Sequence, residues 1–174
     1  MQVSVASAAD EQLLLDLLNT TPVVDGVALD DLEDPKAARN WMRNHGIKPS
    51  DKELSALVKA RSMLQAVVRG SQTPAVLRGV VDSLRLRPVA TADGLDWQVV
   101  LDGAPIGAVR AALAWDSLRI SSPGRLRPCA NDECRLFLID RSKPNTARWC
   151  SMAICGNRMK ARRHYQRNRT GNSA

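Results

Sequence analysis

The sequence contains few aromatic residues, and this shortage limits the folds that it can adopt. Aromatic residues make up 3% of the 174 positions, whereas hydrophobic residues of all kinds reach 44%. Leu, Ala and Val carry most of that apolar content, which favours packed helices over a β-sandwich. The length allows one ordinary core, or one core with a small appended module.

Long apolar segments are also missing. No stretch of about eighteen uncharged apolar residues occurs, so we expect no transmembrane helix and no membrane partner. The first residues, "MQVSVASAADEQLLLDLL", lack a basic start and include Asp10, Glu11 and Asp16, which is untypical of a secretory signal. We therefore expect a cytoplasmic protein in a reducing compartment, where disulfides are rare.

Motifs of common enzyme classes are missing as well. The sequence has no phosphate-binding glycine loop, no dinucleotide fingerprint and no recognisable nucleophile–base pair. We therefore expect that the protein is not an enzyme.

Acidic residues are scarce towards the C-terminus, and none follows Asp140. Residues 123–174 contain 12 Lys and Arg against 3 Asp and Glu, whereas residues 1–122 contain 13 against 15. This asymmetry indicates a polyanionic partner, nucleic acid before an anionic membrane. Because composition and charge change at "SSPGR" (121–125), we predict two domains, 1–122 and 123–174.

The first of these domains is predicted to be mainly α with a small β-hairpin. Asp34 before Pro35 is typical of a helix start, and Ser50 with Glu53 forms a capping-box pattern. An Asp-Gly pair at 93–94 predicts a hairpin within 86–101. Apolar periodicity places helices at about 9–19, 34–45, 50–70, 73–85 and 104–118.

All four cysteines lie in the second domain, in two pairs that each enclose four residues: Cys129 with Cys134, and Cys150 with Cys155. Two such knuckles can complete the tetrahedral sulfur shell of one structural Zn²⁺. Disulfide or redox chemistry and inert buried thiols are the alternatives, but the equal spacing favours zinc. Four sulfur ligands leave no open position for water, which argues against catalytic zinc.

The residues around these cysteines predict a treble-clef-like zinc finger. The segment "RLRPCANDECRLFLID" predicts a hairpin with the first pair at its tip. Ser151 is expected to cap a helix that holds Cys155 in its first turn. Because the core of this domain is small, a chelator is expected to melt residues 125–165 and leave the first domain largely folded.

Cations dominate the chain after Cys155 and the loop that precedes the second pair. Without local acidic residues, a helix this cationic is better stabilised by phosphates than by the protein itself. A solubilising tail is the alternative. Two roles are open for Asn157. Its side chain can bond to a backbone carbonyl of the finger, or it can contact the edge of an adenine base. The candidate nucleic-acid-binding residues are Arg141, Lys143, Arg148, Asn157, Arg158, Lys160, Arg162, Arg163 and Arg167.

The segments "CANDEC", "LFLIDRS" and "RWCSMAICGNRMKARRH" together resemble the CGNR zinc finger, named for the tetrapeptide at 155–158. Residues 13–21, "LLLDLLNTT", and 30–47, "DDLEDPKAARNWMRNHGI", resemble the start of the ABATE domain, although Leu17 replaces an aromatic residue. The resemblance implies a bacterial, stress-induced transcription regulator. It also implies zinc binding by the four cysteines and DNA contact by Arg148, Asn157, Arg158 and Lys160.

From these observations we predict a nucleoid-associated DNA-binding protein, with a homodimer and a small-molecule effector as further expectations. Polar residues beside apolar helices suggest a ligand pocket, although a helix end and core packing explain them as well. The alternatives are an RNA-binding or ribosome-associated module, a module for an acidic protein, and a ligand-binding protein that uses the finger only as a clasp. The candidate pocket residues are Asp16, Asn19, Thr20 and Trp41.

Overall fold

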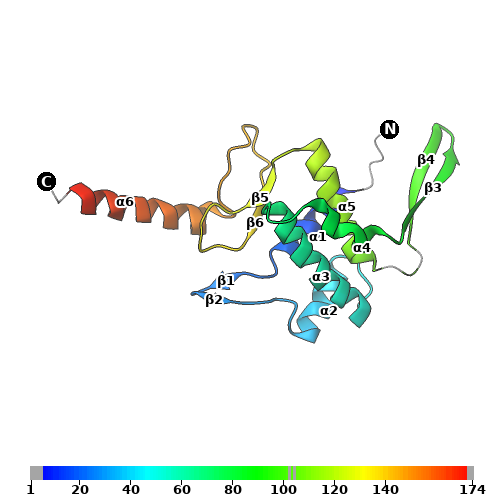
Figure 1. Cartoon of the computed structure of the whole chain (residues 1–174), viewed down its shortest axis with the longest axis horizontal. Helices are drawn as coiled ribbons and strands as arrows, with labels where there is room; N and C mark the ends of the chain where they lie inside the picture. Colours follow the sequence, from blue (N-terminus) through cyan, green and yellow to red (C-terminus); the bar gives the residue numbers. More distant parts are fainter. Residues whose placement is uncertain (1–5, 102, 104, 172–174) are drawn as a thin grey trace.

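A body of packed helices carries a hairpin at one end and a long helix at the other (Figure 1). The computed structural model describes residues 6–101, 103 and 105–171, except for the side chains of 99, 101 and 168–171. Helices α1 (Ala8–Leu18), α3 (Asp51–Val68) and α5 (Ile106–Ser121) pack on one another, and α2 (Pro35–Asn44) lies beside them. The prediction of a mainly α fold is confirmed.

Side-chain caps fix where the first helices begin. Ser7 and Asp10 form a capping box at α1, because each side chain accepts a hydrogen bond from the other residue's backbone N–H. At α2, Asp34 accepts from the N–H of Ala37 at 2.7 Å, with Pro35 in the first turn as predicted. Gly46, with φ of +68°, ends that helix in the left-handed region that glycine tolerates.

The capping box predicted for α3 is half right. Ser50 Oγ accepts from the N–H of Glu53 at 3.1 Å, as expected. The Glu53 carboxylate, however, binds the N–H groups of Ile106 at 2.7 Å and Gly107 at 3.2 Å. Because α5 has no side-chain cap of its own, this distant carboxylate satisfies its first donors and lies favourably at the positive end of its dipole.

The core is made largely of leucine and alanine from α1, α3 and α5. One arginine, Arg61, is 4% exposed at its edge. Its guanidinium binds both carboxylate oxygens of Asp30, at 2.7 and 2.6 Å, and Thr20 Oγ1 at 2.8 Å. This paired charge fastens α3 to the segment that holds the short hairpin of β1 (Val23–Val24) and β2 (Val27–Ala28). The fully buried side chains include Leu13, Leu14, Leu17, Leu18, Leu57 and Leu64.

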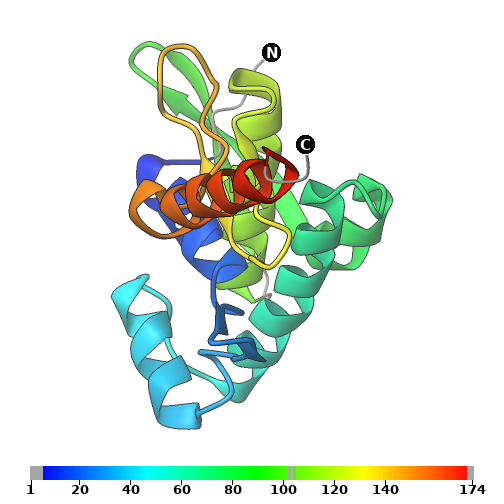
Figure 2. The ribbon, with the colours of Figure 1, turned by 90° about the vertical axis from the view of Figure 1, so that its left-hand side faces the viewer.

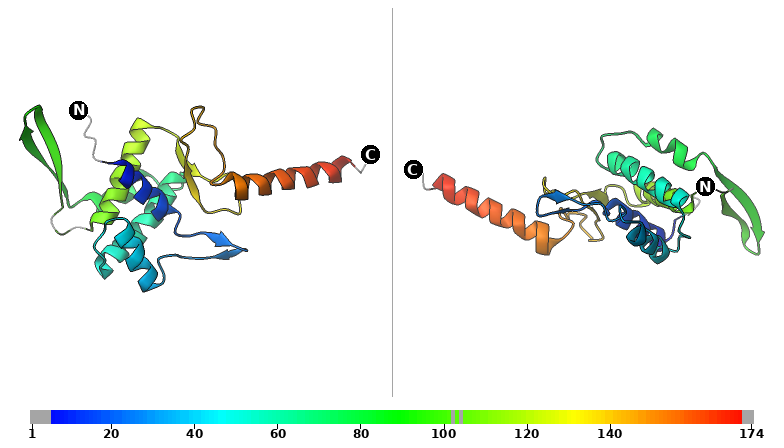
Figure 3. Two further views of the ribbon diagram at one scale, coloured as in Figure 1. Left: turned by 180° about the vertical axis from the view of Figure 1, so that it is seen from behind. Right: turned by 90° about the horizontal axis from the view of Figure 1, so that it is seen from below.

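The helix predicted over 73–85 is wrong beyond Val81. A 3₁₀ turn η1 (Pro74–Leu77) leads into the short α4 (Arg78–Val81), and a strand begins at Leu84. Apolar and polar residues alternate from Leu84 to Arg87, which suits a strand and not a helix. The resulting hairpin of β3 (Leu84–Thr91) and β4 (Gly94–Leu101) projects from the body (Figure 3). Its turn lies at 92–93, one residue earlier than predicted, because Thr91 pairs with Gly94.

The C-terminal part has the predicted order of hairpin, turn and helix. Strands β5 (Leu126–Pro128) and β6 (Phe137–Ile139) pair antiparallel, and the turn η2 (Met152–Gly156) opens α6 (Asn157–Gly171). Figure 2, viewed from the side on which α6 projects, shows this helix in front of the body. Phe137 is 1% exposed and lies in the same core as the leucines of the body. The finger is therefore anchored to the body, and the domain boundary at 122–123 stays a prediction.

Within the described part of the chain, no helix combines the length and the hydropathy that a membrane span requires.

Candidate metal centre and nucleic-acid interface

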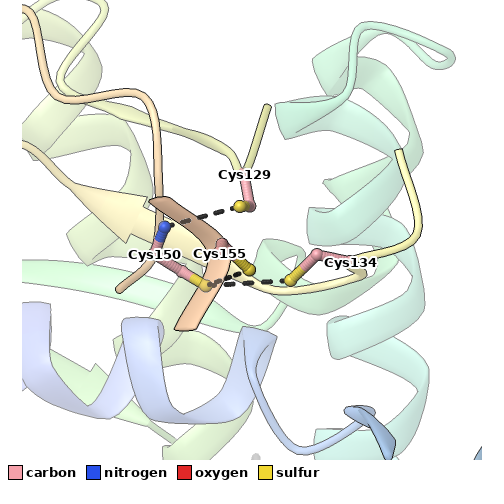
Figure 4. A group of neighbouring side chains, drawn as sticks. All are labelled: Cys129, Cys134, Cys150 and Cys155. Atoms are coloured by element: carbon pink, nitrogen blue, oxygen red, sulfur yellow. Dashed lines mark hydrogen bonds between the residues drawn. The ribbon is translucent and has the colours of Figure 1, made fainter. Parts of the chain in front are cut away.

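The four cysteines converge from two separate knuckles onto one point (Figure 4). Their Sγ atoms all lie within 4.8 Å of one another, and Cys150 Sγ is 3.7 Å from the Sγ atoms of both Cys134 and Cys155. A tetrahedral Zn²⁺ with Zn–S bonds of about 2.3 Å requires sulfur atoms roughly 3.8 Å apart. The spacing therefore fits a single ion, and all four thiols are free of disulfides.

The first knuckle is shaped by backbone hydrogen bonds that follow β5. The N–H of Cys129 donates to the carbonyl of Leu136, and the N–H of Cys134 donates to the carbonyl of Asn131, each at 2.8 Å. Asn131 is fully buried, and its Nδ2 lies 3.5 Å from Cys155 Sγ. Its amide joins the two knuckles and orients a ligand, which is the role of an outer-shell residue at a metal site.

The second knuckle runs into the turn η2. Ser151 Oγ accepts from the N–H of Ile154 at 3.3 Å, which confirms the predicted cap. The N–H of Gly156 donates to the Ser151 carbonyl at 3.0 Å, a wide turn that places Cys155 at the start of the helix. A Cβ on Gly156 would lie 2.8 Å from Met152 Sδ and 3.3 Å from Trp149 Cδ1, so the close neighbours of this glycine are side chains.

Electrostatics show why the thiols need a cation. Burial raises the pKa of Cys134 to about 11, and burial followed by the charges of Cys134 and Cys129 raises the pKa of Cys150 further. For Cys155, burial acts in the same direction, but hydrogen bonds, led by that of Asn131, lower its pKa. Several thiolates are therefore unfavourable together unless a metal ion supplies positive charge.

The donor set identifies the metal that fits. Four thiolates in a closed, partly buried shell suit Zn²⁺, and such a site has a structural role. Here Cys129 and Cys155 are buried, whereas Cys134 and Cys150 are half-buried. The backbone N–H of Cys150 lies 3.4 Å from Cys129 Sγ and supports that ligand. The centre is one structural zinc site formed by both knuckles.

Helix α6 carries most of the predicted nucleic-acid-binding residues. Asn157 has the structural contact of the two that were predicted, because its Nδ2 donates to the carbonyl of Ala153 at 3.2 Å. Arg162 forms an ion pair with Glu133 of the first knuckle, and Arg158 contributes to the lowered pKa of that glutamate after Arg162. Among the described side chains of the helix, up to residue 167, the exposed cations are Arg158, Lys160, Arg163 and Arg167.

The basic loop before the second knuckle is held by Asp140, a residue that the sequence analysis missed. Its buried carboxylate accepts from the hydroxyl and N–H of Ser142, from the N–H of Ala147 and from Arg127. These contacts, led by the Ser142 hydroxyl, lower the pKa of Asp140 to about 2 against the opposing effect of burial. An Asp followed two residues later by Ser is the local signal that could have identified this turn.

The basic side chains of this loop have different contacts. Arg141 pairs with Glu11 of α1 at 3.1 Å, and Arg148 lies over the Trp149 ring at 5.2 Å from its centroid. Lys143 is exposed beside them. The loop and α6 therefore form two basic surfaces that the zinc centre joins.

The four predicted pocket residues have structural partners instead of one shared cavity. Asp16 Oδ2 lies 3.0 Å from His45 Nε2, and Trp41 stacks on the His45 ring. Thr20 binds Arg61 as described above, and Asn19 binds the backbone of Phe137. Only Asn19 of the four lines a cavity of about 420 Å³, whose lining comes from α1, the β1 segment and the finger. An effector site stays a prediction.

Comparison with known families supports this organisation. Residues 11–131 match the ABATE family, described as "Putative stress-induced transcription regulator", and residues 125–168 match the CGNR zinc finger. No match was found among curated proteins. The first match covers more than half of the chain, and the second contains all four zinc ligands. The protein is therefore a member of the ABATE family that carries a C-terminal CGNR zinc finger.

Proposed function

We propose that the protein binds duplex DNA through α6 and the loop 141–148, and that it regulates transcription in the bacterial cytoplasm at the nucleoid. The observation that carries this proposal is the position of α6, which projects from the zinc centre beyond the helical body (Figure 1). A projecting helix with cations along it can enter a major groove, which is wide enough for one helix.

Charge supports the proposal. No acidic residue lies in the sequence after Asp140, so the described part of α6 has only cationic side chains among its charged groups. Seven phosphate contacts would give a slope of roughly −6 in log K against log salt on B-DNA. The zinc centre fixes the first turn of the helix, so its direction is set before DNA binds.

The proposal includes no catalytic step. Zinc held by four thiolates has no open coordination position for water or substrate, so the ion stabilises the finger. Regulation is supported by the family description of the N-terminal match.

A salt titration of the full chain, with its zinc content measured, tests DNA binding. Random duplex DNA, RNA of matched sequence and a pool of selectable oligonucleotides serve as targets. We expect salt-sensitive binding that prefers duplex DNA and yields an enriched sequence. Binding that prefers RNA, or no binding at all, would contradict the proposal.

Matched variants locate the contact. Arg158→Ala with Arg162→Ala is expected to weaken duplex binding and reduce the salt slope by about two, with zinc content unchanged. Lys36→Ala with Arg39→Ala removes the same charge from exposed positions of α2 and is expected to leave binding nearly unchanged. Equal weakening in both pairs would show that net charge alone, and not α6, determines affinity.

A further inference from the structure

The zinc centre borders a cavity that opens to solvent. Three of the four ligands, Cys134, Cys150 and Cys155, line the cavity of about 420 Å³ beside the finger. Val24 and Ile154 also line it and are 49% and 62% exposed, so small molecules can enter. Cys134 and Cys150 are half-buried, whereas Cys155 is buried. Two thiolates of the centre are therefore accessible to a molecule in this cavity.

Hydrogen bonds distinguish Cys150 from the other three ligands. A hydrogen bond to a thiolate stabilises its negative charge and makes the sulfur a weaker nucleophile. Each of the other sulfur atoms has one N–H donor: Cys150 for Cys129, Leu136 for Cys134 and Asn131 for Cys155. Among the described residues, no N–H donates to Cys150 Sγ, whose close contacts are the sulfur atoms of Cys134 and Cys155. Cys150 is therefore the strongest nucleophile of the four, and it faces the cavity.

The size and lining of the cavity indicate the kind of molecule that fits beside Cys150. Most of the lining away from the ligands is apolar and includes Leu15, Val23, Leu136 and Leu138. The cavity is also large compared with the roughly 30 Å³ that one water molecule occupies in the liquid. A small polar molecule would leave most of this apolar surface uncovered, whereas a molecule with a hydrocarbon part would bury it.

We propose that the cavity binds organic hydroperoxides, which oxidise Cys150 and Cys134 to a disulfide. Cys150 Sγ attacks the terminal peroxide oxygen, the O–O bond breaks, and an alcohol leaves a sulfenic acid on Cys150. Cys134 Sγ, 3.7 Å away, then attacks that sulfur, so the S–S bond forms, the S–O bond breaks and water leaves. The two thiolates lose two electrons in total, and the hydroperoxide with two solvent protons becomes one alcohol and one water.

Charge at the cavity suits this chemistry. Negative charge develops on the leaving alkoxide, and a guanidinium in the same cavity can stabilise it. Arg158 lines the cavity, and Glu133, which also lines it, is already paired with Arg162. The disulfide removes two of the four sulfur ligands, and the two that remain cannot complete a tetrahedral shell. Oxidation at Cys150 is therefore expected to release zinc from the finger.

Zinc release from the zinc-loaded full chain, followed with a chromogenic chelator, tests the proposal. Cumene hydroperoxide and hydrogen peroxide are compared at equal concentration, and the chain unfolded in urea gives the reference ratio of their reaction rates with the thiols. We expect that folding raises this ratio roughly tenfold, which corresponds to the burial of two methylene-sized groups. Tandem mass spectrometry after alkylation is expected to find the Cys134–Cys150 disulfide. An unchanged ratio, or a first disulfide that includes Cys129, would overturn the proposal.

A matched pair of variants tests the role of the cavity and leaves every cysteine in place. Val24→Trp fills part of the cavity and is expected to slow zinc release by cumene hydroperoxide several-fold, with little effect on hydrogen peroxide. The control is Ile120→Trp on α5, because Ile120 is 52% exposed and does not line the cavity. A rate that Val24→Trp does not reduce, or that both variants reduce equally, would overturn the proposal. Zinc content and thermal unfolding confirm that each variant is folded, and no readout depends on DNA binding.

Discussion

Asn19 of α1 and Phe137 of β6 bind each other by two hydrogen bonds across 118 residues of sequence. The Phe137 N–H donates to Asn19 Oδ1 at 2.7 Å, and Asn19 Nδ2 donates to the Phe137 carbonyl at 3.2 Å. The side-chain amide of Asn19 thus bonds to β6 in the way that the backbone of a neighbouring strand would. The Arg69 guanidinium lies over the Phe137 ring, 4.4 Å from its centroid, so body and finger are joined at Phe137.

Replacement of Asn19 is expected to destabilise both parts of the protein together. Asn19→Ala leaves a half-buried N–H and carbonyl of Phe137 unpaired, which costs about 1–3 kcal/mol. Denaturant unfolding monitored by circular dichroism measures the loss. Asn40→Ala is the control, because Asn40 is exposed and its side chain accepts a hydrogen bond from the Arg43 side chain of the same helix. An equal, small effect in both variants would contradict a structural role for the Asn19–Phe137 pair.

Removal of zinc is expected to destabilise α1 as well as the finger. The sequence alone predicted that a chelator would melt 125–165 and spare the body, but Phe137 lies in the shared core. Hydrogen exchange resolved by peptide, with and without chelator, is the measurement. We expect faster exchange in α1 that readdition of zinc reverses. Unchanged exchange in α1 beside a melted finger would restore the prediction of two independent domains.

The charge of Asp140 is expected to stabilise the finger above acidic pH. Folding lowers its pKa from 3.8 to about 2, so its contribution is complete above the unfolded pKa and is lost as pH falls through the folded pKa. Asp140→Asn should therefore be less stable at neutral pH, with the difference from wild type shrinking between pH 3.8 and about 2.

Unfolding by urea over a pH series measures that difference. Acid also releases zinc from thiolates, so zinc content is measured at each pH, and a loss of structure that follows zinc release in both proteins is not counted as an effect of Asp140. Asp31→Asn removes an exposed carboxylate and serves as the control. If the difference in unfolding free energy between the two proteins stays constant through the acidic range, the hydrogen bonds of Asp140 stabilise the finger and its charge does not.

Glu133 is expected to weaken DNA binding, because its carboxylate pairs with Arg162 on α6. Glu133→Gln frees that guanidinium for phosphate, so duplex affinity is expected to rise roughly twofold to fivefold at low salt. Glu33→Gln makes the same charge change on an exposed residue of the body and should have little effect. A lower affinity in Glu133→Gln would instead show that the ion pair positions the helix for binding.

Local patterns predicted the features that depend on neighbouring residues. The spacing of Cys129, Cys134, Cys150 and Cys155 predicted one metal centre, because thiolate ligands on two short knuckles have few other arrangements. Capping residues predicted the starts of α2 and α3 for the same reason, since a cap bonds within one turn.

Contacts between distant segments could not be predicted in this way. The Glu53 carboxylate serves a helix more than fifty residues away, and nothing near it in sequence distinguishes this from its expected bond to Ser50. The partner of Asn19 likewise depends on how the finger packs on α1. The polar residues predicted to line a ligand pocket have tertiary partners, and a sequence alone does not identify these partners.

The hairpin and α6 lie at opposite ends of the long axis of the molecule (Figure 1). Duplex DNA held by α6 would therefore lie at the end of the molecule opposite to the hairpin. Occupancy of α6 by DNA would leave the surface of the hairpin open to solvent.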